Sequence, residues 1–212
     1  MRPPFASGTL GTWTSPGSSF RALAVGMLMA IGCRESRDAQ ATPLPTATPT
    51  DRFWAIVEHA RARSSECDNV AQRLADTLSR LPAPAIVEFS NELDARMAES
   101  YRWDLWAVAY VANGGASDDG FDYFRAWLIT RGREQFERAL RDAPSAVEGA
   151  PRSGELECED VIGVANEAYN RVAGKAMPAS TVRWPKEPVG KPWTEETIDQ
   201  VYPGLTARVR KR

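Results

Sequence analysis

The most informative part of this 212-residue chain is YRWDLWAVAYVANGGASDDGFDYFRAWLITRG, residues 101–132. Apolar side chains recur there at intervals of three and four residues on both sides of a glycine-rich corner, which predicts two amphipathic helices. Gly114 and Gly115 are expected to end the first helix, because glycine readily takes the left-handed conformation found there. Ser117 is expected to cap the second helix and Gly132 to end it. The apolar stripes are Leu105, Trp106, Ala109, Tyr110 and Val111, then Phe121, Phe124, Leu128 and Ile129.

The corner between the two helices is acidic. Asp118 and Asp119 fall in the first turn of the second helix, where carboxylates interact favourably with the helix dipole. Asp122 shares a face with Asp118, and Arg125 follows three residues later. Either these groups cap the helix and form an ion pair, which the sequence favours, or they recognise a cation or a basic ligand. The candidate ligand-binding residues are Trp103, Asp104, Asp118, Asp119, Asp122 and Arg125.

The same residues carry a family resemblance. WDLWAVAY (103–110) and GG-x-SDDGFDYFRAWLI (114–129) resemble the signature of the bacterial domain-of-unknown-function family 4240. The resemblance extends from DRFWAIVEHAR at Asp51, through ECEDVIGVANEAY at Glu157, to the PW…YPGL ending near Leu205. Similar proteins often have a cysteine where this chain has Ala116, so no thiol role carries over. Because the function of the family is unassigned, the resemblance implies a domain boundary and no activity.

Residues 1–32 have the features of a lipoprotein-type signal peptide. The apolar run ALAVGMLMAIG, residues 22–32, is shorter than the roughly 20 residues that a membrane-spanning helix needs but suits a signal-peptide core. Small residues precede Cys33, as in a bacterial lipobox, which predicts lipidation of Cys33. An ordinary signal peptide, or an uncleaved N-terminal anchor, is the alternative. Residues 33–50, rich in Pro, Thr and Ala, are expected to form a disordered tether, and Arg34 weakly favours the outer membrane.

The net charge and the cysteines restrict the possible classes of function and the compartment of the protein. The formal net charge is −2, and it becomes −4 without the two arginines of residues 1–32, which argues against nonspecific nucleic-acid binding. If Cys33 carries lipid, Cys67 and Cys158 remain, and we hypothesise that they form a disulfide in an oxidising compartment. No metal-ligand spacing is present, no cofactor is expected, and the single histidine, His59, is expected to be exposed.

The rest of the chain predicts a single compact all-α domain over residues 51–212, with about six to eight helices and no strand. Thr50 is the expected cap of a first helix over residues 51–63, with Trp54 at the margin of its apolar face. Residues 142–154 are expected to be a loop and residues 155–173 the last long helix, with Ile162 and Val172 facing inward. An extended segment packed by its tryptophans follows, and Thr194 is expected to cap a short final helix.

No nucleophile elbow, zinc-binding HExxH, phosphate loop or Cys–His signature is present. The sequence therefore favours a lipid-anchored, extracytoplasmic binding or interaction module over an enzyme. Its expected partners are the membrane, through the lipid, and an unidentified protein or small molecule. The alternative is a hydrolase of the cell envelope that uses Asp118, Asp119 and Asp122 as acid and base.

Overall fold

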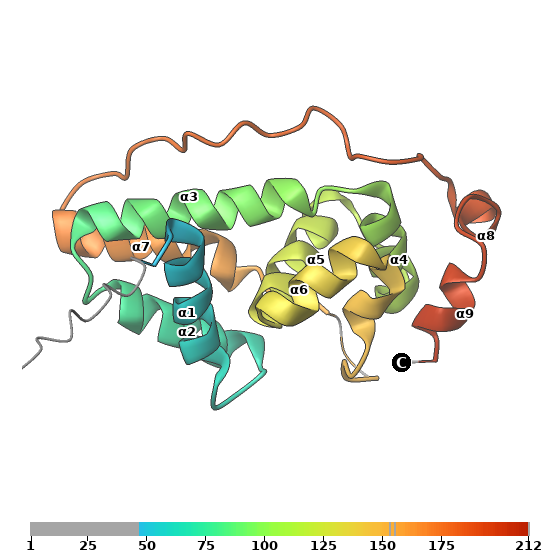
Figure 1. Ribbon diagram of the computed structural model, residues 1–212, viewed down its shortest axis with the longest axis horizontal. Helices are drawn as coiled ribbons and strands as arrows, with labels where there is room; N and C mark the ends of the chain where they lie inside the picture. Colours follow the sequence, from blue (N-terminus) through green and yellow to red (C-terminus); the bar gives the residue numbers. More distant parts are fainter. Residues whose placement is uncertain (1–46, 153, 155, 212) are drawn as a thin grey trace, which may run out of the picture. The chain divides into compact units, whose positions relative to one another are not determined.

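The computed structural model describes residues 47–152, 154 and 156–211. The predicted signal peptide, the lipidation site Cys33 and residues 34–46 of the predicted tether lie outside the described residues. The described chain is helical, with no strand and one isolated bridge, between Arg102 and Val189, which confirms the all-α class. Its elements (Figure 1) are α1 Pro49–Arg61, α2 Cys67–Leu78, α3 Ala83–Glu99, α4 Trp103–Asn113, α5 Asp118–Thr130, α6 Arg133–Arg141, η1 Ala143–Val147, α7 Asp160–Ala173, η2 Glu195–Thr197, α8 Ile198–Val201 and α9 Leu205–Val209.

The nine α-helices of the described residues exceed the expected six to eight by one. The excess comes from the C-terminal end, where η2 and α8 form the short helix expected after Thr194, and α9 follows as a further helix of five residues. The expected loop after α6 is also partly helical, because residues 143–147 form the buried 3-10 turn η1. Segments this short carry too few apolar repeats for a periodic pattern to stand out.

Helix α5 is the central element. It contacts α1, α2, α3, α4, α6 and α7, and its seven residues from Phe124 to Thr130 are all buried. Phe121 and Phe124 are fully inaccessible, and burying a side chain of this size contributes about 1.5–3 kcal/mol. The stretch that predicted the fold therefore supplies its core, with Ser117 as the cap and Gly114 in the left-handed conformation at the end of α4.

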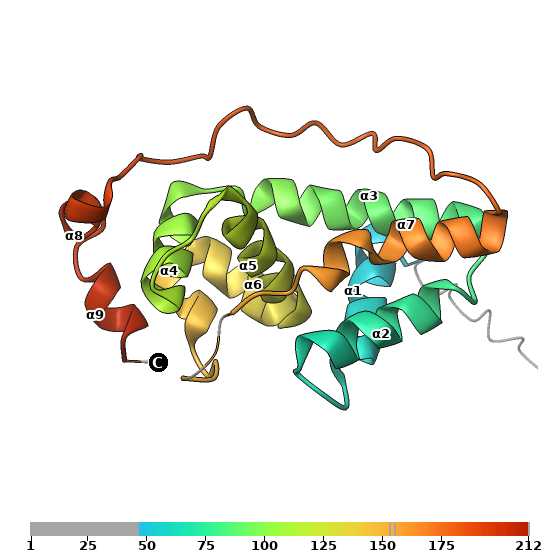
Figure 2. The ribbon, with the colours of Figure 1, turned by 180° about the vertical axis from the view of Figure 1, so that it is seen from behind.

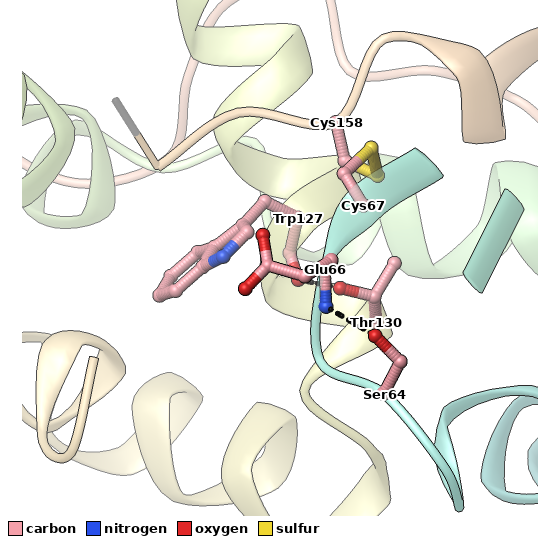
Figure 3. Close-up of a disulfide and its surroundings, with 6 residues drawn as sticks. All are labelled: Ser64, Glu66, Cys67, Trp127, Thr130 and Cys158. Atoms are coloured by element: carbon pink, nitrogen blue, oxygen red, sulfur yellow. Dashed lines mark hydrogen bonds between the residues drawn. A yellow bond between two sulfur atoms is a disulfide. The ribbon is translucent and has the colours of Figure 1, made fainter. Parts of the chain in front are cut away.

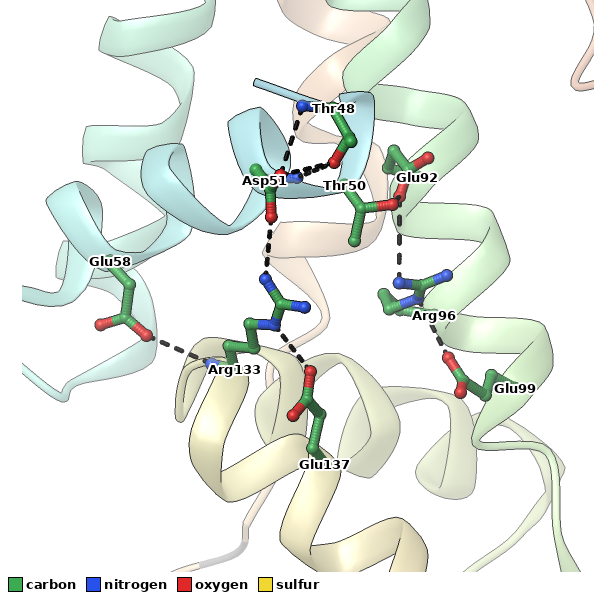
Figure 4. Close-up of polar contacts among 9 residues, drawn as sticks. All are labelled: Thr48, Thr50, Asp51, Glu58, Glu92, Arg96, Glu99, Arg133 and Glu137. Atoms are coloured by element: carbon green, nitrogen blue, oxygen red, sulfur yellow. Dashed lines mark hydrogen bonds and ion pairs between the residues drawn. The ribbon is translucent and has the colours of Figure 1, made fainter. Parts of the chain in front are cut away.

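Helix α1 begins two residues earlier than expected. Its N-cap is Thr48, not Thr50: the Thr48 hydroxyl accepts from the Asp51 N–H at 3.1 Å, and the Asp51 carboxylate accepts in return from the Thr48 N–H. This reciprocal capping box (Figure 4) satisfies two backbone donors at once. Thr50 instead donates to Glu92 of α3 at 2.9 Å. The last two residues of the predicted tether thus belong to the helix.

Trp54 of α1 is buried and does not lie at a margin, contrary to the expectation. Its ring lies 5.0 Å from that of Phe53 in an edge-to-face arrangement and 5.4 Å from that of Phe136 on α6. The apolar pattern of α1 shows one buried face, and Trp54 lies beside it. A second neighbouring helix, α6, covers Trp54 through Phe136, and the pattern of α1 alone does not reveal this contact. Aromatic pairs at these distances add about 0.5–1.5 kcal/mol to the burial itself.

Helix α7 begins at Asp160, five residues later than expected. The residues before it, Leu156 and Cys158, are buried without being helical. Their N–H groups donate to the side chain of Asn113 and to the carbonyl of Tyr123, both at 3.0 Å. Two residues expected to face inward from α7, Ile162 and Val172, are 38% and 41% exposed. The buried face of α7 is Val161, Val164, Ala165, Ala168 and Tyr169.

Residues 174–194 form an extended segment that runs along α3 to reach α8 (Figure 2). It is attached to α3 through Thr181, whose N–H donates to the Asn91 side chain at 3.2 Å. Val189 exchanges two backbone hydrogen bonds, each of 2.9 Å, with Tyr101 and Trp103 at the start of α4.

No helix of the described residues is long and apolar enough to span a membrane.

Candidate functional site

The acidic corner is built as a helix cap. The hydroxyl of Ser117 accepts from the N–H of Gly120 at 3.1 Å, while Asp118 and Asp119 stand exposed in the first turn of α5. The N–H of Gly115 donates to the carbonyl of Tyr110 at 2.8 Å and closes the end of α4. These contacts match the capping interpretation of the sequence. Recognition of a ligand by Asp118 and Asp119 stays a prediction.

Asp122 and Arg125 form an ion pair, as the same interpretation expected. Arg125 is only 1% exposed, although it carries a charge, whereas the Asp122 side chain is 45% exposed. Burial lowers the pKa of Arg125, and the charge of Asp122 opposes that shift. Arginine keeps its proton at neutral pH, so the core of this domain contains a buried cation.

Aromatic rings surround that cation. The guanidinium carbon of Arg125 lies 4.9 Å from the ring centres of Tyr101 and Phe121 and 5.4 Å from that of Trp184. A second nitrogen donates to the carbonyl of Met97 at the end of α3. Cation–π contacts of a desolvated arginine contribute about 2 kcal/mol or more. Arg125 therefore joins α3, α5 and the extended C-terminal segment.

Trp103 and Asp104 lie at the opposite end of an aromatic ladder from Arg125. Trp103 stacks on Trp106 at 5.4 Å, and Trp106 stacks on Phe121 at 4.9 Å. Asp104 is engaged elsewhere: it accepts from Arg102 at 2.9 and 2.6 Å. It also lines a depression near α8 and α9 that Asp122 does not line. The six candidate residues thus do not converge on one pocket.

Asp122 does line a larger groove, of about 740 Å³, between α2, α5 and α7. Its lining holds five acidic residues and, among the described residues, no lysine or arginine. We call this the acidic groove. Its carboxylates are those of Asp68, Asp122, Glu159, Asp160 and Glu167.

A disulfide brings the walls of the acidic groove together. The structure contains the hypothesised bond between Cys67 and Cys158, whose Cα atoms lie 5.4 Å apart, and it packs beside Trp127 and Thr130 of α5 (Figure 3). Cys67 is the first residue of α2, and Cys158 precedes α7 by two residues. The bond therefore places the acidic first turns of these two helices side by side.

Four of the five groove carboxylates were not predicted: Asp68, Glu159, Asp160 and Glu167. A signal for three of them was present, since the sequence reads Cys-Asp at 67–68 and Cys-Glu-Asp at 158–160. The disulfide hypothesised from the sequence already implied that these acids lie close together. Tyr123 also lines the groove. Its hydroxyl is hydrogen-bonded to Glu159, and this contact raises the pKa of Tyr123.

The acidic groove suits a ligand with several spaced positive charges. Among the described residues no group of three or more His, Cys, Asp or Glu side chains is close enough together to hold a metal ion. The five carboxylates are instead spread over α2, α5, α7 and Glu159, which precedes α7. Unbalanced charge of one sign in a concave surface attracts ligands of the other sign and raises their rate of association.

These features define an all-α domain with a disulfide-bridged acidic groove. Residues 49–171 match the model of a family described as "Protein of unknown function (DUF4240)", and the chain belongs to that family. The match ends inside α7, so the extended segment and the C-terminal helices lie beyond it. No curated protein matches the chain, and no solved structure does.

Proposed function

We propose that this protein is a binding module of the cell envelope, held to a membrane by lipid on Cys33, and that its acidic groove takes a basic segment of a partner protein. The observation that carries the binding role is the lining of the groove: five carboxylates and no lysine or arginine among the described residues. A groove of about 740 Å³ accommodates a few side chains of a peptide rather than a single ion.

Support for a location outside the cytoplasm comes from two independent features. The apolar run of residues 22–32 directly precedes Cys33, as in lipoprotein signal peptides. The Cys67–Cys158 disulfide is of a kind that persists in oxidising compartments and is rare in the bacterial cytosol. A tether between the lipid and α1 would leave the groove free to meet a partner.

The hydrolase alternative has no observation in its favour. Asp118 and Asp119 are exposed at a helix end, and Asp122 is engaged by Arg125. A general acid works from a cleft that shields its carboxyl from water, and the exposed Asp118 and Asp119 have no such cleft among the described residues.

Binding is tested with an oligolysine peptide as the probe, titrated calorimetrically into the purified full chain at low and at physiological salt. The groove variant is Glu159→Gln with Glu167→Gln. The matched control is Asp118→Asn with Asp119→Asn, which removes the same charge from the corner. We expect at least a tenfold loss of affinity in the groove variant and less than a twofold change in the control. Equal losses in both variants, or no binding to the wild type, would refute the role of the groove.

The anchor is tested separately with Cys33→Ser. Wild-type protein is expected in the detergent phase after phase separation, and the variant in the aqueous phase after removal of the leader. Metabolic labelling with a fatty acid should mark the wild type alone. An unchanged partition together with absent labelling removes the lipid from the proposal and leaves the groove result unaffected.

A further inference from the structure

Another depression, of about 450 Å³, lies between the C-terminal parts of α1 and α2. Three arginines line it, Arg63, Arg73 and Arg80, together with His59 and the hydroxyl-bearing Thr77. One acidic residue, Asp76, is also part of the lining, and it accepts from the Gln72 amide at 3.0 Å. We call this depression the basic pocket. Its formal charge is positive in a chain whose formal net charge is −2.

The arginines of the basic pocket are among the nine arginines of the described residues that form no ion pair. Eight other arginines form ion pairs with carboxylates. Among the described residues, no ion pair involves Arg63, Arg73 or Arg80. Three like charges around one concave surface repel one another, so an anion bound between them would relieve that repulsion.

Helix ends account for only part of this arrangement. Arg63 and Arg80 follow the ends of α1 and α2, where positive charge offsets the partial negative charge of the terminal carbonyl groups. Arg73 lies in the middle of α2, half-buried and far from either end. Its presence in the pocket is therefore not explained by the helix dipole.

The sequence of α2 separates the two depressions by helical periodicity. Positions 68, 71, 72 and 75 line the acidic groove, and positions 73, 76, 77 and 80 line the basic pocket. Each set follows the spacing i, i+3, i+4, i+7, which marks one face of a helix. Val70, Leu74 and Leu78 point into the core between them. The helix thus turns one face to the acidic groove, one to the basic pocket and one to the core.

We propose that the basic pocket binds a phosphate group. The planar guanidinium fork matches phosphate oxygens in a two-pronged fashion, and the Thr77 hydroxyl supplies a neutral donor in the same lining. The phosphate can belong to a free anion or to an anionic lipid headgroup, which share this chemistry. The inference does not depend on the acidic groove, because the two surfaces use different faces of α2.

The test uses the full chain with Cys33→Ser, which has no lipid of its own. Inorganic phosphate is titrated calorimetrically at low ionic strength, with chloride of equal ionic strength as the reference. In a second arm, the protein is sedimented with vesicles of phosphatidylcholine alone or with phosphatidylglycerol. The pocket variant is Arg73→Gln with Arg80→Gln. Its matched control is Arg141→Gln with Arg183→Gln, two exposed arginines outside the pocket.

We expect at least a tenfold loss of binding in the pocket variant and less than a twofold change in the control. The single variant Arg63→Gln lies outside any helix and should weaken binding severalfold, which guards against a folding defect in α2. Loss in the phosphate arm supports a site for a free anion, and loss in the phosphatidylglycerol arm alone supports a headgroup site. Equal losses in both double variants, or no binding in either arm, overturn the proposal.

Discussion

Cys67 and Cys158 are 91 positions apart in the chain, yet their disulfide closes α2 against the start of α7. A cross-link over so long a loop restricts the unfolded chain strongly and stabilises the fold by roughly 2–5 kcal/mol. The same bond aligns the carboxylates that follow each cysteine. Stability and the shape of the acidic groove are therefore coupled at this position.

The double variant Cys67→Ser with Cys158→Ser should lower the free energy of unfolding by roughly 2–5 kcal/mol relative to the oxidised wild type. Urea denaturation measures the change, and reduction of the wild type should reproduce most of it. Titration of the unfolded, unreduced wild-type chain should find neither Cys67 nor Cys158 as a free thiol. Two free thiols from these positions would contradict the disulfide.

Asp122→Asn should destabilise the domain by about 1–3 kcal/mol, because it removes the only ion-pair partner that the described residues give to the buried Arg125. The exposure of Asp122 keeps the effect below that of a fully buried pair. Asp118→Asn on the same helix is the control, and the loss there should be at most a few tenths of a kcal/mol. Comparable losses from the two variants would mean that the buried cation does not depend on Asp122.

Two glycine substitutions should change stability in opposite directions. Gly114 has φ +76° at the end of α4, with no atom within 4 Å of an added Cβ, so Gly114→Ala meets backbone strain alone and should cost about 1 kcal/mol. Gly163 lies inside α7 with equally open space, and Gly163→Ala should stabilise by about 0.5–1 kcal/mol. Thermal denaturation should show a lower melting temperature for Gly114→Ala and a higher one for Gly163→Ala. A shift in the same direction for both variants would contradict this explanation.

The capping box of α1 makes stability depend on pH in a defined direction. Hydrogen bonds from Thr48, followed by one from Arg133, lower the pKa of Asp51 (Figure 4). A lowered carboxyl pKa stabilises the fold above the ordinary pKa of aspartate, and this contribution disappears as the pH falls through the lowered value. Asp51→Asn should therefore lower the melting temperature at pH 7 and have little effect near pH 2.

Thr48→Ala, which removes the other half of the box, should cost about 0.5–2 kcal/mol at neutral pH. Thr50→Ala is the informative comparison, because Thr50 is the cap that the sequence suggested but lies inside the helix. Urea denaturation should rank Thr48→Ala as the more damaging change. The reverse order would restore Thr50 as the cap.

The sequence predicted the helices that bury a continuous stripe, and it predicted them because burial repeats with the helical period. Ile86, Phe89, Leu93 and Met97 on α3 recur at intervals of three and four residues and are all buried. Predictions from the sequence were wrong where the outcome depends on a contact that the apolar pattern does not show. Thr48 and Thr50 both precede Asp51, and only the reach of that carboxylate back to Thr48 decides between them.

The candidate site was predicted less completely. Asp122 and Arg125 pair as neighbours on one helix do, because their distance is set by α5 alone. The acidic groove depends on how α2, α5 and α7 meet, which no single helix encodes. The sequence carries a signal for the basic pocket, since Arg73 and Arg80 continue the helical spacing of Asp76 and Thr77.

The pairing of Val189 with Tyr101 and Trp103 also bears on how the C-terminal end would behave after cleavage. The exposed Arg183 and Lys186 lie between the attachment points at Thr181 and Val189, within reach of trypsin. A single cut there would break the covalent link between the rest of the domain and the helices α8 and α9, but it would leave the noncovalent contacts in place. The two pieces should migrate together on a native column and part only in denaturant, because backbone hydrogen bonds and the Trp193 ring still hold them.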